Sequence, residues 1–551
     1  MSDRFRKGLA IVLALALALT VFGIGGCQPK EDEGTGEEPT GDVQKGGTFA
    51  YYITEPAFID PYNAQESEGT QVVQAVFDSL VTFDPLTLEI LPAAAESWEA
   101  NEDATVWTFT LVEGATFHNG DPVTAADFKY AWERIANPDN ASEIAYHLAP
   151  VKGFDEMQAG EATELSGVVA VDERTLEVTL NYPYGDFEYV VGHPGLAPVP
   201  QSAVEADAEG FAEMPIGNGP FKLAEPWAHN QYIKVVKNED YYGDEPNIDG
   251  VDFKIFQDED TAFLEFEAGN LDFTHIPSGQ IAQVIEKYGE SDDGFTIAEG
   301  KQAVTGLEMA VYYYAINTKK APFDDPKVRQ ALSYACPRQK IIDTLFDGIR
   351  QPADGMVPPN LAAYESGAWP ASVDDMEKAA QLLEEAGYPG GEGFPAFTIA
   401  VNSGVGHEDI AQIFLDNLTQ LGLEVTLEPR EWAQHIDALQ NGEYDIARFG
   451  WIADYPTADN FLYSLFITDG SDNVTFYSNP DVDAALTEAR QETDEDARIA
   501  QYKEINKMIG ADQPVIPVMY YSHIHVGSDR IRDGIYNAQG LFNFESVWLA
   551  Q

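Results

Sequence analysis

Cysteine is nearly absent from this sequence: 551 residues contain two, Cys27 and Cys336. Two cysteines cannot form the disulfide framework that stabilises small secreted domains. Cys336 lies in ALSYACPRQKI, directly before Pro337, and this context predicts a small buried residue near the end of a helix. The fold must therefore depend on apolar cores, and an apolar fraction of 44% is sufficient to build them.

Basic residues are also scarce, because 31 Lys and Arg stand against 93 Asp and Glu. The net charge is −62 and the isoelectric point is about 4.1. A chain this acidic repels phosphate backbones and anionic lipid, so we exclude nucleic acid as a partner. The acidity is interpreted first as a means of solvation, and the alternative is an acidic cleft that attracts cations.

The short motifs of the common enzyme classes are missing. There is no HExxH, no GxSxG, no Walker loop and no GxGxxG that opens a helix. With 93 carboxylates, pairs of Asp and Glu arise by chance and do not indicate a glycosidase. His523 and His525 share one face of an expected strand, but nothing near them supplies further metal ligands. We therefore expect no catalysis, no cofactor and no metal site.

The apolar run at the N-terminus is too short for a permanent membrane span. Residues 9–24 form a run of 16 residues after a positively charged start, whereas a spanning helix needs roughly 20. Two glycines and then Cys27 follow. This pattern predicts a signal peptide over residues 1–26. It resembles the bacterial lipobox, which implies cleavage before Cys27 and a diacylglyceryl group on its sulfur. The alternative is a plain secretory signal with an incidental cysteine.

Residues 27–45 are polar, acidic and rich in Gly and Pro, so they cannot bury apolar surface. We interpret them as a disordered tether between the lipid anchor and a globular body. The expected location is extracytoplasmic, anchored to the bacterial cell membrane by lipid and facing the cell surface or the periplasm.

From residue 46 onward, the spacing of apolar residues alternates between period two and the helical period. The expected strands begin at residue 47 and cover 105–114, 174–180 and a segment ending at 427; the expected helices cover 72–83, 123–135, 374–386 and 408–421. Residues 117–121 predict a tight turn, and residues 215–221 an open loop. Alternating strands and helices predict an α/β fold whose sheets are covered by helices, and the length favours two lobes with a ligand cleft between them.

Several segments together resemble one family, the large solute-binding lipoproteins of bacterial peptide ABC importers (extracellular solute-binding protein family 5, the oligopeptide- and dipeptide-binding proteins). The matching segments are LPAAAESWEA, FTLVEGATFHNGDPVTAADFKYAWERI, IGNGPFKL, NEDYYGD, AINTKKAPFDDPKVRQALSYACPRQKI, DDMEKAAQLLEEAGYPGG and EYDIARFGWIADYPTADNFL. Their number and order carry the resemblance, which covers nearly everything from about residue 46 to 551.

The resemblance implies a two-lobed periplasmic-binding-protein-like fold of type II, large class, with an extra domain inserted in the first lobe. The implied division is lobe I at 46–85, 205–303 and 522–551, the inserted domain at 86–204, and lobe II at 304–521. It further implies a peptide ligand, permease subunits of an ABC transporter as partners, a monomeric state, and capture of solute without catalysis.

The segment FGWIADYP supplies the main candidate for ligand binding. In peptide-binding members an aspartate at the position of Asp454 pairs with the α-amino group of the ligand. Trp451 and Ile452 are expected to lower the local dielectric and so strengthen that pair, and Tyr455 is expected to form a wall of the pocket. The alternative for Asp454 is a structural role, either capping the helix that follows or pairing internally, for instance with Arg448.

Further candidates come from the resemblance and, for Asn218, from its place in the open loop at 215–221; three of them have an alternative. Arg448 meets a ligand carboxylate or holds the loop; His407 lies near the carboxyl end of the ligand or simply begins a helix; Asn218 donates to the ligand or shapes its turn; Gln65, Glu66 and Ser67 lie in a loop that faces the cleft. A further arginine of some members is replaced by Leu439 here.

Three other functions remain open from the sequence. The same architecture carries nickel chelates, haem or oligosaccharides in related proteins, so the solute need not be a peptide. A secreted acidic hydrolase is the alternative of another class, although the sequence shows no nucleophile or metal constellation for it. A surface adhesin on the same scaffold is a third.

Overall fold

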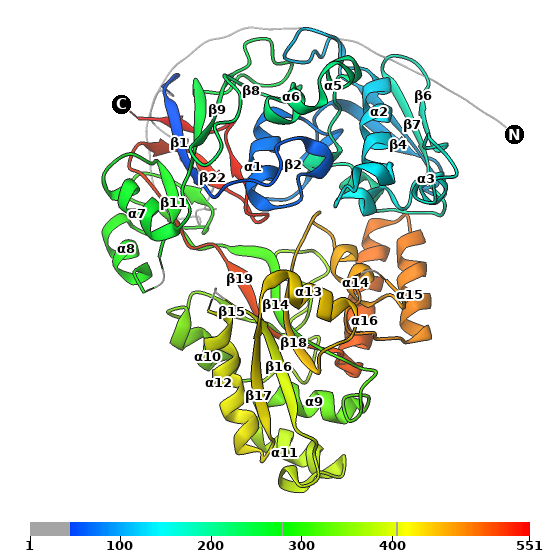
Figure 1. Cartoon of the computed structure of the whole chain (residues 1–551), viewed down its shortest axis with the longest axis vertical. Helices are drawn as coiled ribbons and strands as arrows, with labels where there is room; N and C mark the ends of the chain where they lie inside the picture. The colour runs from blue at the N-terminus through cyan, green and yellow to red at the C-terminus, as the bar shows by residue number, and fades with distance from the viewer. Residues whose placement is uncertain (1–43, 278, 404–405, 471, 551) are drawn as a thin grey trace, which may run out of the picture. The chain divides into compact units, whose positions relative to one another are not determined.

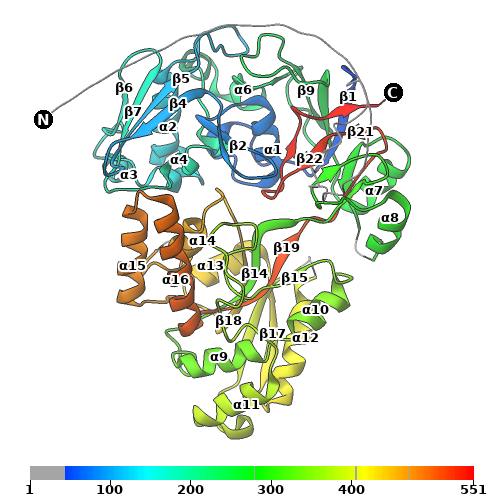
Figure 2. The same cartoon turned by 180° about the vertical axis from the view of Figure 1, so that it is seen from behind.

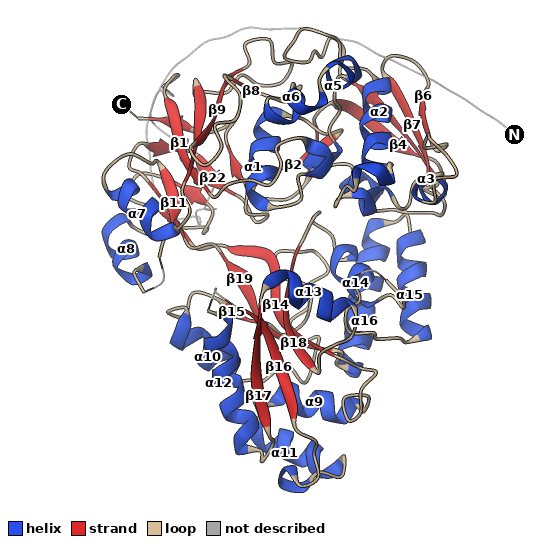
Figure 3. Cartoon of the chain, viewed as in Figure 1, coloured by secondary structure: helices blue, strands red, loops and turns tan. Residues whose placement is uncertain are grey.

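The computed structural model describes residues 44–277, 279–403, 406–470 and 472–550. The predicted signal peptide, the lipidation site Cys27 and most of the predicted tether lie outside these residues. Three larger sheets organise the described chain, with seven, six and four strands. Figures 1 and 2 show them from opposite sides, and Figure 3 separates strands from helices by colour.

The seven-stranded sheet has strands from widely separated parts of the chain. Its order is β13 (Ala303–Val304), β20 (His525–Gly527), β11 (Phe273–His275), β1 (Thr48–Ile53), β10 (Gly250–Ile255), β9 (Tyr232–Lys237) and β8 (Phe221–Leu223). β1 is parallel to β10 and β11, and the other pairs are antiparallel. In β1 the residues Phe49, Tyr51 and Ile53 alternate into one buried core, as period two requires.

The four-stranded sheet is antiparallel, in the order β4 (Ala95–Ala100), β5 (Val106–Leu111), β7 (Thr175–Thr179) and β6 (Val168–Ala170). Helix α2 (Ala125–Ala136) packs on this sheet (Figure 3). It buries Phe128, Trp132 and Ile135, which lie on one helical face.

The six-stranded sheet has the order β15 (Gln351–Pro352), β19 (Val515–Ser522), β14 (Leu307–Ile316), β18 (Ile446–Ile452), β16 (Phe397–Asn402) and β17 (Val425–Arg430). All residues of β14 from Met309 to Ile316 are buried because cores lie on both faces of the sheet. Val311 and Tyr313 face a core formed with helices between residues 459 and 512, and Tyr312 and Tyr314 face one formed with helices between residues 326 and 420. A strand that is covered on both faces has apolar residues at consecutive positions of its sequence.

The remaining elements are short strands and helices. The strands are β2 (Val81–Phe83), β3 (Ile90–Pro92), β12 (Thr296–Ile297), β21 (Ile531–Arg532), β22 (Gly534–Tyr536), β23 (Phe542–Asn543) and β24 (Trp548–Leu549). The helices are α1 (Ser67–Val76), α3 (Phe154–Gln158), α4 (Phe187–Val190), α5 (Gln201–Ala206), α6 (Ala208–Glu213), α7 (Glu259–Glu267), α8 (Ile281–Tyr288), α9 (Pro326–Tyr334), α10 (Arg338–Leu345), α11 (Met376–Glu385), α12 (His407–Gln420), α13 (Trp432–Gln440), α14 (Asp459–Phe466), α15 (Pro480–Gln491) and α16 (Glu495–Asp512).

The chain passes between the seven- and six-stranded sheets at two adjacent points. Thr305 and Gly306 join β13 to β14, and His523 and Ile524 join β19 to β20. The His523 N–H donates to the Gly306 carbonyl at 2.9 Å, which holds the two crossings side by side. A pair of short crossings of this kind is the geometry of a hinge.

Most of the predicted elements are confirmed, and two need correction. The helix expected over 72–83 runs over Ser67–Val76, and Val81–Phe83 forms a strand that pairs with β3. The strand expected to carry both His523 and His525 is interrupted between β19 and β20, because the chain changes sheets there. Among the described residues, no cluster of His, Cys, Asp and Glu could hold a metal ion.

Cys336 is buried, as predicted, and burial raises the pKa of its thiol to about 12. In the part of the chain that the structure describes, no helix combines the length and apolar character that crossing a bilayer requires. The domain boundaries inferred from the sequence remain a prediction.

Replacing Thr124 with alanine tests the N-terminus of α2. The Thr124 hydroxyl and backbone N–H both donate to Asp127, at 2.6 and 2.9 Å, and close a capping box. We expect Thr124→Ala to lower the free energy of unfolding by about 1 kcal/mol, measured by urea denaturation. Thr124→Ser keeps the hydroxyl and serves as the control, and equal stability of the two variants would contradict the assignment.

Candidate functional site

Strand β18 leaves the protein core as it approaches Asp454. Ile446 and Ala447 are buried, the next four residues are half-buried, and Ile452 is 53% exposed. The expected contribution of Ile452 to a low dielectric at Asp454 stays a prediction. Strand β14 pairs with β18 along its whole length, from Ile446 to Ile452. On the other side, the described strands pair with β18 only at Ile446 and Ala447, so one backbone edge stays open from Phe449 onward.

The carboxylate of Asp454 is positioned by Asn460 in α14. The Asn460 amide donates to Asp454 Oδ2 at 2.8 Å, and its Oδ1 accepts from the Asp454 N–H at 3.1 Å and from the Trp451 indole at 2.9 Å. Burial raises the pKa of Asp454, and Asn460, His193 and Tyr146 oppose that shift. No Lys or Arg among the described residues forms an ion pair with Asp454.

Arg448 does not pair with Asp454 in this structure. Its guanidinium donates to Asn402 Oδ1 at 3.2 Å and to the Tyr521 hydroxyl at 2.9 Å. The guanidinium carbon lies 4.9 Å from the centre of the Tyr312 ring. Asp454 does not cap α14 either, because the residue before that helix is Ala458. Among the described residues, Asp454 thus neither caps α14 nor pairs with Arg448, and its internal hydrogen-bond partner is Asn460.

A second arginine, Arg350, lies near Arg448, and sequence reasoning missed it. Its guanidinium carbon lies 4.0 Å from the centre of the Phe346 ring and 4.9 Å from that of Tyr521. The Nε atoms of both arginines are buried without a hydrogen-bond partner. Burial lowers the pKa of Arg350. Within the described residues, neither guanidinium has a carboxylate at ion-pair distance, so together they form a cationic surface.

His407 joins this cationic surface at the first residue of α12. Its ring centre lies 5.5 Å from that of Tyr312, and its Nδ1 is buried without a hydrogen-bond partner. Burial, together with Arg448 and Arg350, lowers the pKa of His407 to about 3, so the imidazole is neutral. His435 Nε2 lies 2.8 Å from the Arg448 carbonyl. A helix N-terminus beside two guanidinium groups is an environment that stabilises an anion.

Tyr455 lies in a different buried network, centred on Asp459. The Asp459 carboxylate accepts a bidentate pair from Arg490 at 2.7 Å and hydrogen bonds from Tyr184, Tyr502 and Tyr455 at 2.7, 2.9 and 3.1 Å. Burial alone would raise the pKa of Asp459, but Arg490 holds it below its usual value. The Tyr455 hydroxyl is therefore committed to this network.

The candidates in the first part of the chain make internal contacts. Asn218 is fully buried, accepts from the Asp78 N–H and donates to the Asp78 carbonyl, each at 3.0 Å, which favours its turn-shaping role. Glu66 caps α1 by accepting from the Gly69 and Ala57 N–H groups at 2.7 Å. Gln65 and Ser67 are exposed. Leu439 is buried in the core.

Comparison with known proteins places the chain in a family. The family model for "Bacterial extracellular solute-binding proteins, family 5 Middle" matches residues 89–473. The chain belongs to this family. As a family 5 solute-binding protein, it is 28% identical over 554 residues to the oligopeptide-binding protein OppA of Bacillus subtilis, and the match covers 98% of each chain. The resemblance stated from the sequence is thereby confirmed.

Solved structures confirm the predicted two-lobed α/β fold. The murein tripeptide-binding protein MppA of Escherichia coli superposes with a TM-score of 0.76 at 28% identity, covering 92% of this chain and 99% of that one. OppA of Haemophilus influenzae, in complex with the peptide RPPGFSPFR, superposes with a TM-score of 0.74 at 29% identity, covering 93% and 100%. The family and these relatives are substrate-binding proteins.

The Asp459 network generates a stability prediction. Removing one partner of a buried ion pair leaves an uncompensated charge, so Arg490→Met should lower the free energy of unfolding by about 3–5 kcal/mol. Lys301 pairs with Asp292 at the surface, 2.6 Å apart, and Lys301→Met, as the matched control, should cost less than about 1 kcal/mol. Urea denaturation of both variants measures the difference, and similar losses would contradict the stabilising role of the network.

Proposed function

We propose that this family 5 protein is the substrate-binding component of an ABC importer, which captures extended peptides outside the membrane and delivers them to a permease. The observation that carries the proposal is the separation of opposite charges along β18 and the residues just after it. Asp454, without a cationic partner among the described residues, follows the strand, and Arg448 lies six residues earlier, beside Arg350 and His407. The names of the relatives and the peptide complex of Haemophilus influenzae OppA support the same ligand class.

The amino end of the peptide would bind at Asp454. A half-buried carboxylate that is positioned by a neutral amide gains stability from pairing with a charged ammonium group. Trp451 is fixed by its indole hydrogen bond to Asn460 and lies beside this position. The Tyr455 hydroxyl donates to Asp459 and so helps to hold this segment in place. It would not contact the ligand.

The carboxyl end would bind at the cationic surface of Arg448, Arg350 and His407. Arg448 lies within β18, and Asp454 follows two residues after the strand ends at Ile452. Six residues of extended chain span about 20 Å, the length of roughly six residues of an extended peptide. Opposite charges at that spacing select a ligand that carries an ammonium group at one end and a carboxylate at the other.

The open edge of β18 would bind the backbone between these ends. Beyond Ala447 the described strands leave one side of β18 unpaired, and an extended peptide could add there as a strand. Main-chain hydrogen bonds do not depend on side-chain identity, so they suit capture of peptides of varied sequence. Ile452, exposed at this edge, offers an apolar contact to a ligand side chain.

The paired crossings and the sequence suggest how the protein encloses its ligand and where it is anchored. Closure about the paired crossings at Gly306 and His523 would enclose the ligand. We infer a cleaved signal peptide, a lipid anchor at Cys27, a flexible tether, a monomeric state and permease subunits as partners. Capture and release of an unchanged solute needs no catalysis, so we propose that the protein is not an enzyme.

Blocking the ligand's amino group tests the role of Asp454. We expect Asp454→Ala to weaken binding of an unmodified peptide by about 2–5 kcal/mol, because a charged partner is lost from a buried pair. Isothermal titration calorimetry with the same peptide, free and N-acetylated, separates this loss from general damage.

The wild type should bind the acetylated peptide weakly, and Asp454→Ala should discriminate little between the two peptides. The matched control is Asp445→Ala, which removes a carboxylate that pairs with Lys320 at 3.1 Å and should leave the discrimination unchanged. If Asp454→Ala retains the full preference for the free amino group, the assignment is wrong.

The affinity should also depend on pH in a direction set by Asp454. Burial raises the pKa of this carboxyl, and only its ionised form pairs with an ammonium group. Affinity should therefore be greatest above that raised pKa and fall as the pH drops through it, since the α-amino group stays charged below its own pKa of about 8. Calorimetry of wild type and Asp454→Asn checks this, and an equal pH dependence in both would contradict it.

A further inference from the structure

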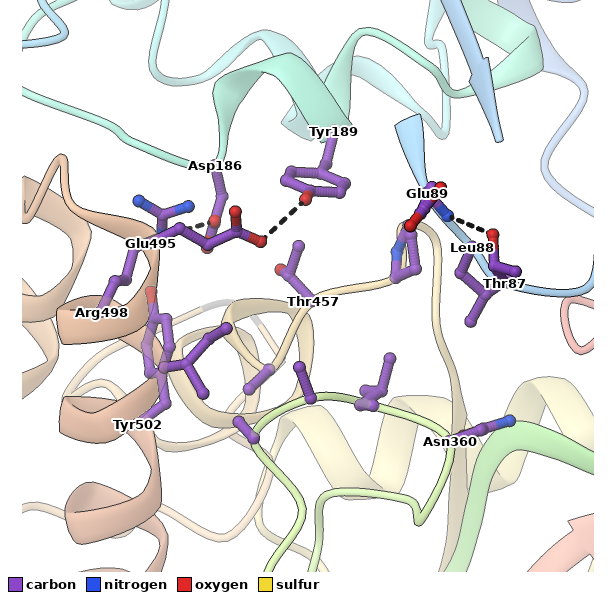
Figure 4. Close-up of a pocket in the computed structure, with 16 residues that line it drawn as sticks. Thr87, Leu88, Glu89, Asp186, Tyr189, Asn360, Thr457, Glu495, Arg498 and Tyr502 are labelled. Carbon is purple, nitrogen blue, oxygen red and sulfur yellow. Dashed lines mark hydrogen bonds and ion pairs between the residues drawn. The ribbon is translucent and has the colours of Figure 1, made fainter. Parts of the chain in front are cut away.

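A separate pocket lies beside the Asp454 segment, on the side of Pro456 to Ala458. Its volume is about 260 Å³. One wall comes from the β2–β3 turn and from α4, and the other comes from residues 360–363, residues 456–458 and the start of α16. Figure 4 shows side chains from both walls around this space. The proposed peptide contacts Asp454, Arg448 and His407 are not among its lining residues.

Three carboxylates and one guanidinium line the pocket. Glu89 and Glu495 are exposed, whereas Asp186 is only 2% exposed. The cation, Arg498, is already engaged, because it lies 2.7 Å from Asp186 Oδ1 and donates to the Glu492 carbonyl at 3.0 Å. The pocket therefore has an excess of negative charge.

Two shifts in pKa agree with this excess of negative charge. The pKa of Tyr189 is raised by burial and by Glu495, Glu188 and Asp186. Burial and Asp459 raise the pKa of Asp186 to about 7, although Arg498 opposes the shift. Both groups lie in a place where a further positive charge would be stabilised.

Unsatisfied hydrogen-bond acceptors line the same pocket. Oδ2 of Asp186 and Oδ1 of Asn360 are buried without a hydrogen-bond partner, and so is the Thr457 hydroxyl. A buried acceptor without a donor is destabilising, and more so when it is charged. The group that would complete this pocket is therefore a hydrogen-bond donor.

The rest of the lining is apolar. Leu88, Leu361, Ala363, Ala458 and Ile499 contribute hydrocarbon surface between the polar groups. A ligand that matches both parts has a cationic, hydrogen-bond-donating head on a short aliphatic stem. A volume of about 260 Å³ admits a stem of a few carbon atoms.

We propose that this pocket binds an alkylammonium or alkylguanidinium group, with Asp186 Oδ2 accepting from the head and Glu89 and Glu495 attracting it at the mouth. The group has two possible sources, a basic side chain of a bound peptide or a free amine. Because the two walls carry one exposed carboxylate each, a cation between Glu89 and Glu495 would also link them. This site is distinct from Asp454 and does not depend on the proposed function.

The test uses n-butylammonium and n-propylguanidinium as probes, with 1-butanol as the uncharged control. Calorimetry is done on the full-length Asp454→Asn variant, so that binding at the proposed amino-end site does not contribute. We expect saturable binding of both cations and none of 1-butanol. Adding Glu89→Gln and Glu495→Gln should weaken it at least about tenfold, since two attractive charges are lost at the mouth.

Both glutamates are exposed, so these changes should leave the fold intact, and circular dichroism verifies it. Ala362→Leu, which fills the pocket with apolar volume, should also weaken binding. Absence of saturable binding, or binding unchanged in the double glutamine variant, would overturn the proposal.

The source of the cation is resolved by competition in the wild type. If a peptide side chain fills the pocket, a lysine-containing peptide should bind more tightly than its norleucine counterpart, and n-butylammonium should compete only with the former. If a free amine fills it, both peptides should bind equally and together with n-butylammonium. Either result supports cation binding in this pocket. If the cations bind but peptides do not, the proposed function alone is contradicted.

Discussion

A buried charge is stable only when an opposite charge or hydrogen-bond donors lie beside it. The arrangement of this molecule around β18 depends on which of its carboxylates have such partners. Asp454 and Asp459 lie on the same segment; Asp459 is fully buried and Asp454 is half-buried. Asp459 has a bidentate arginine and three tyrosine hydroxyls. Asp454 is positioned by the neutral amide of Asn460 and has, among the described residues, no ion-pair partner. Asp459 stabilises the fold, and we propose that Asp454 retains electrostatic free energy for a ligand.

The sheet architecture provides the rigidity that this contrast requires. Strand β14 is buried on both faces and pairs with β18 along its full length. That pairing fixes the direction in which β18 leaves the core, and so sets the separation of Arg448 and Asp454. The Asp459 network then joins the segment to α15 and α16 and to Tyr184. A site held by such elements keeps its two charged ends at a constant distance.

Local patterns predicted much of the fold. The alternation in β1 and β5, the N-cap Thr124 and the stop of α11 before Gly387 follow from period and capping, which are properties of neighbouring residues. The end of α1 at Val76 was not predictable in this way, because pairing of Val81–Phe83 with β3 competes with an apolar spacing that suits a helix. Tertiary context decides such cases.

The candidate site was predictable only where a local motif carried it. Asp454 and Arg448 stand in one short segment, but Arg350 is brought to them by the pairing of β15, β19, β14 and β18. His435 reaches the Arg448 carbonyl through the placement of α13. The pocket at Asp186 combines residues from turns, loops and helices far apart in the chain. A local sequence pattern cannot predict these contacts, because strand order and helix packing bring the residues together.

We propose that opposite charges at the two ends of one open strand edge select a peptide as the ligand. Native mass spectrometry of freshly purified protein, followed by release and identification of the bound solute, tests it most directly. We expect a mixture of short peptides with free amino and carboxyl ends. Release of a metal chelate, a haem or an oligosaccharide as the bound solute would contradict the claim.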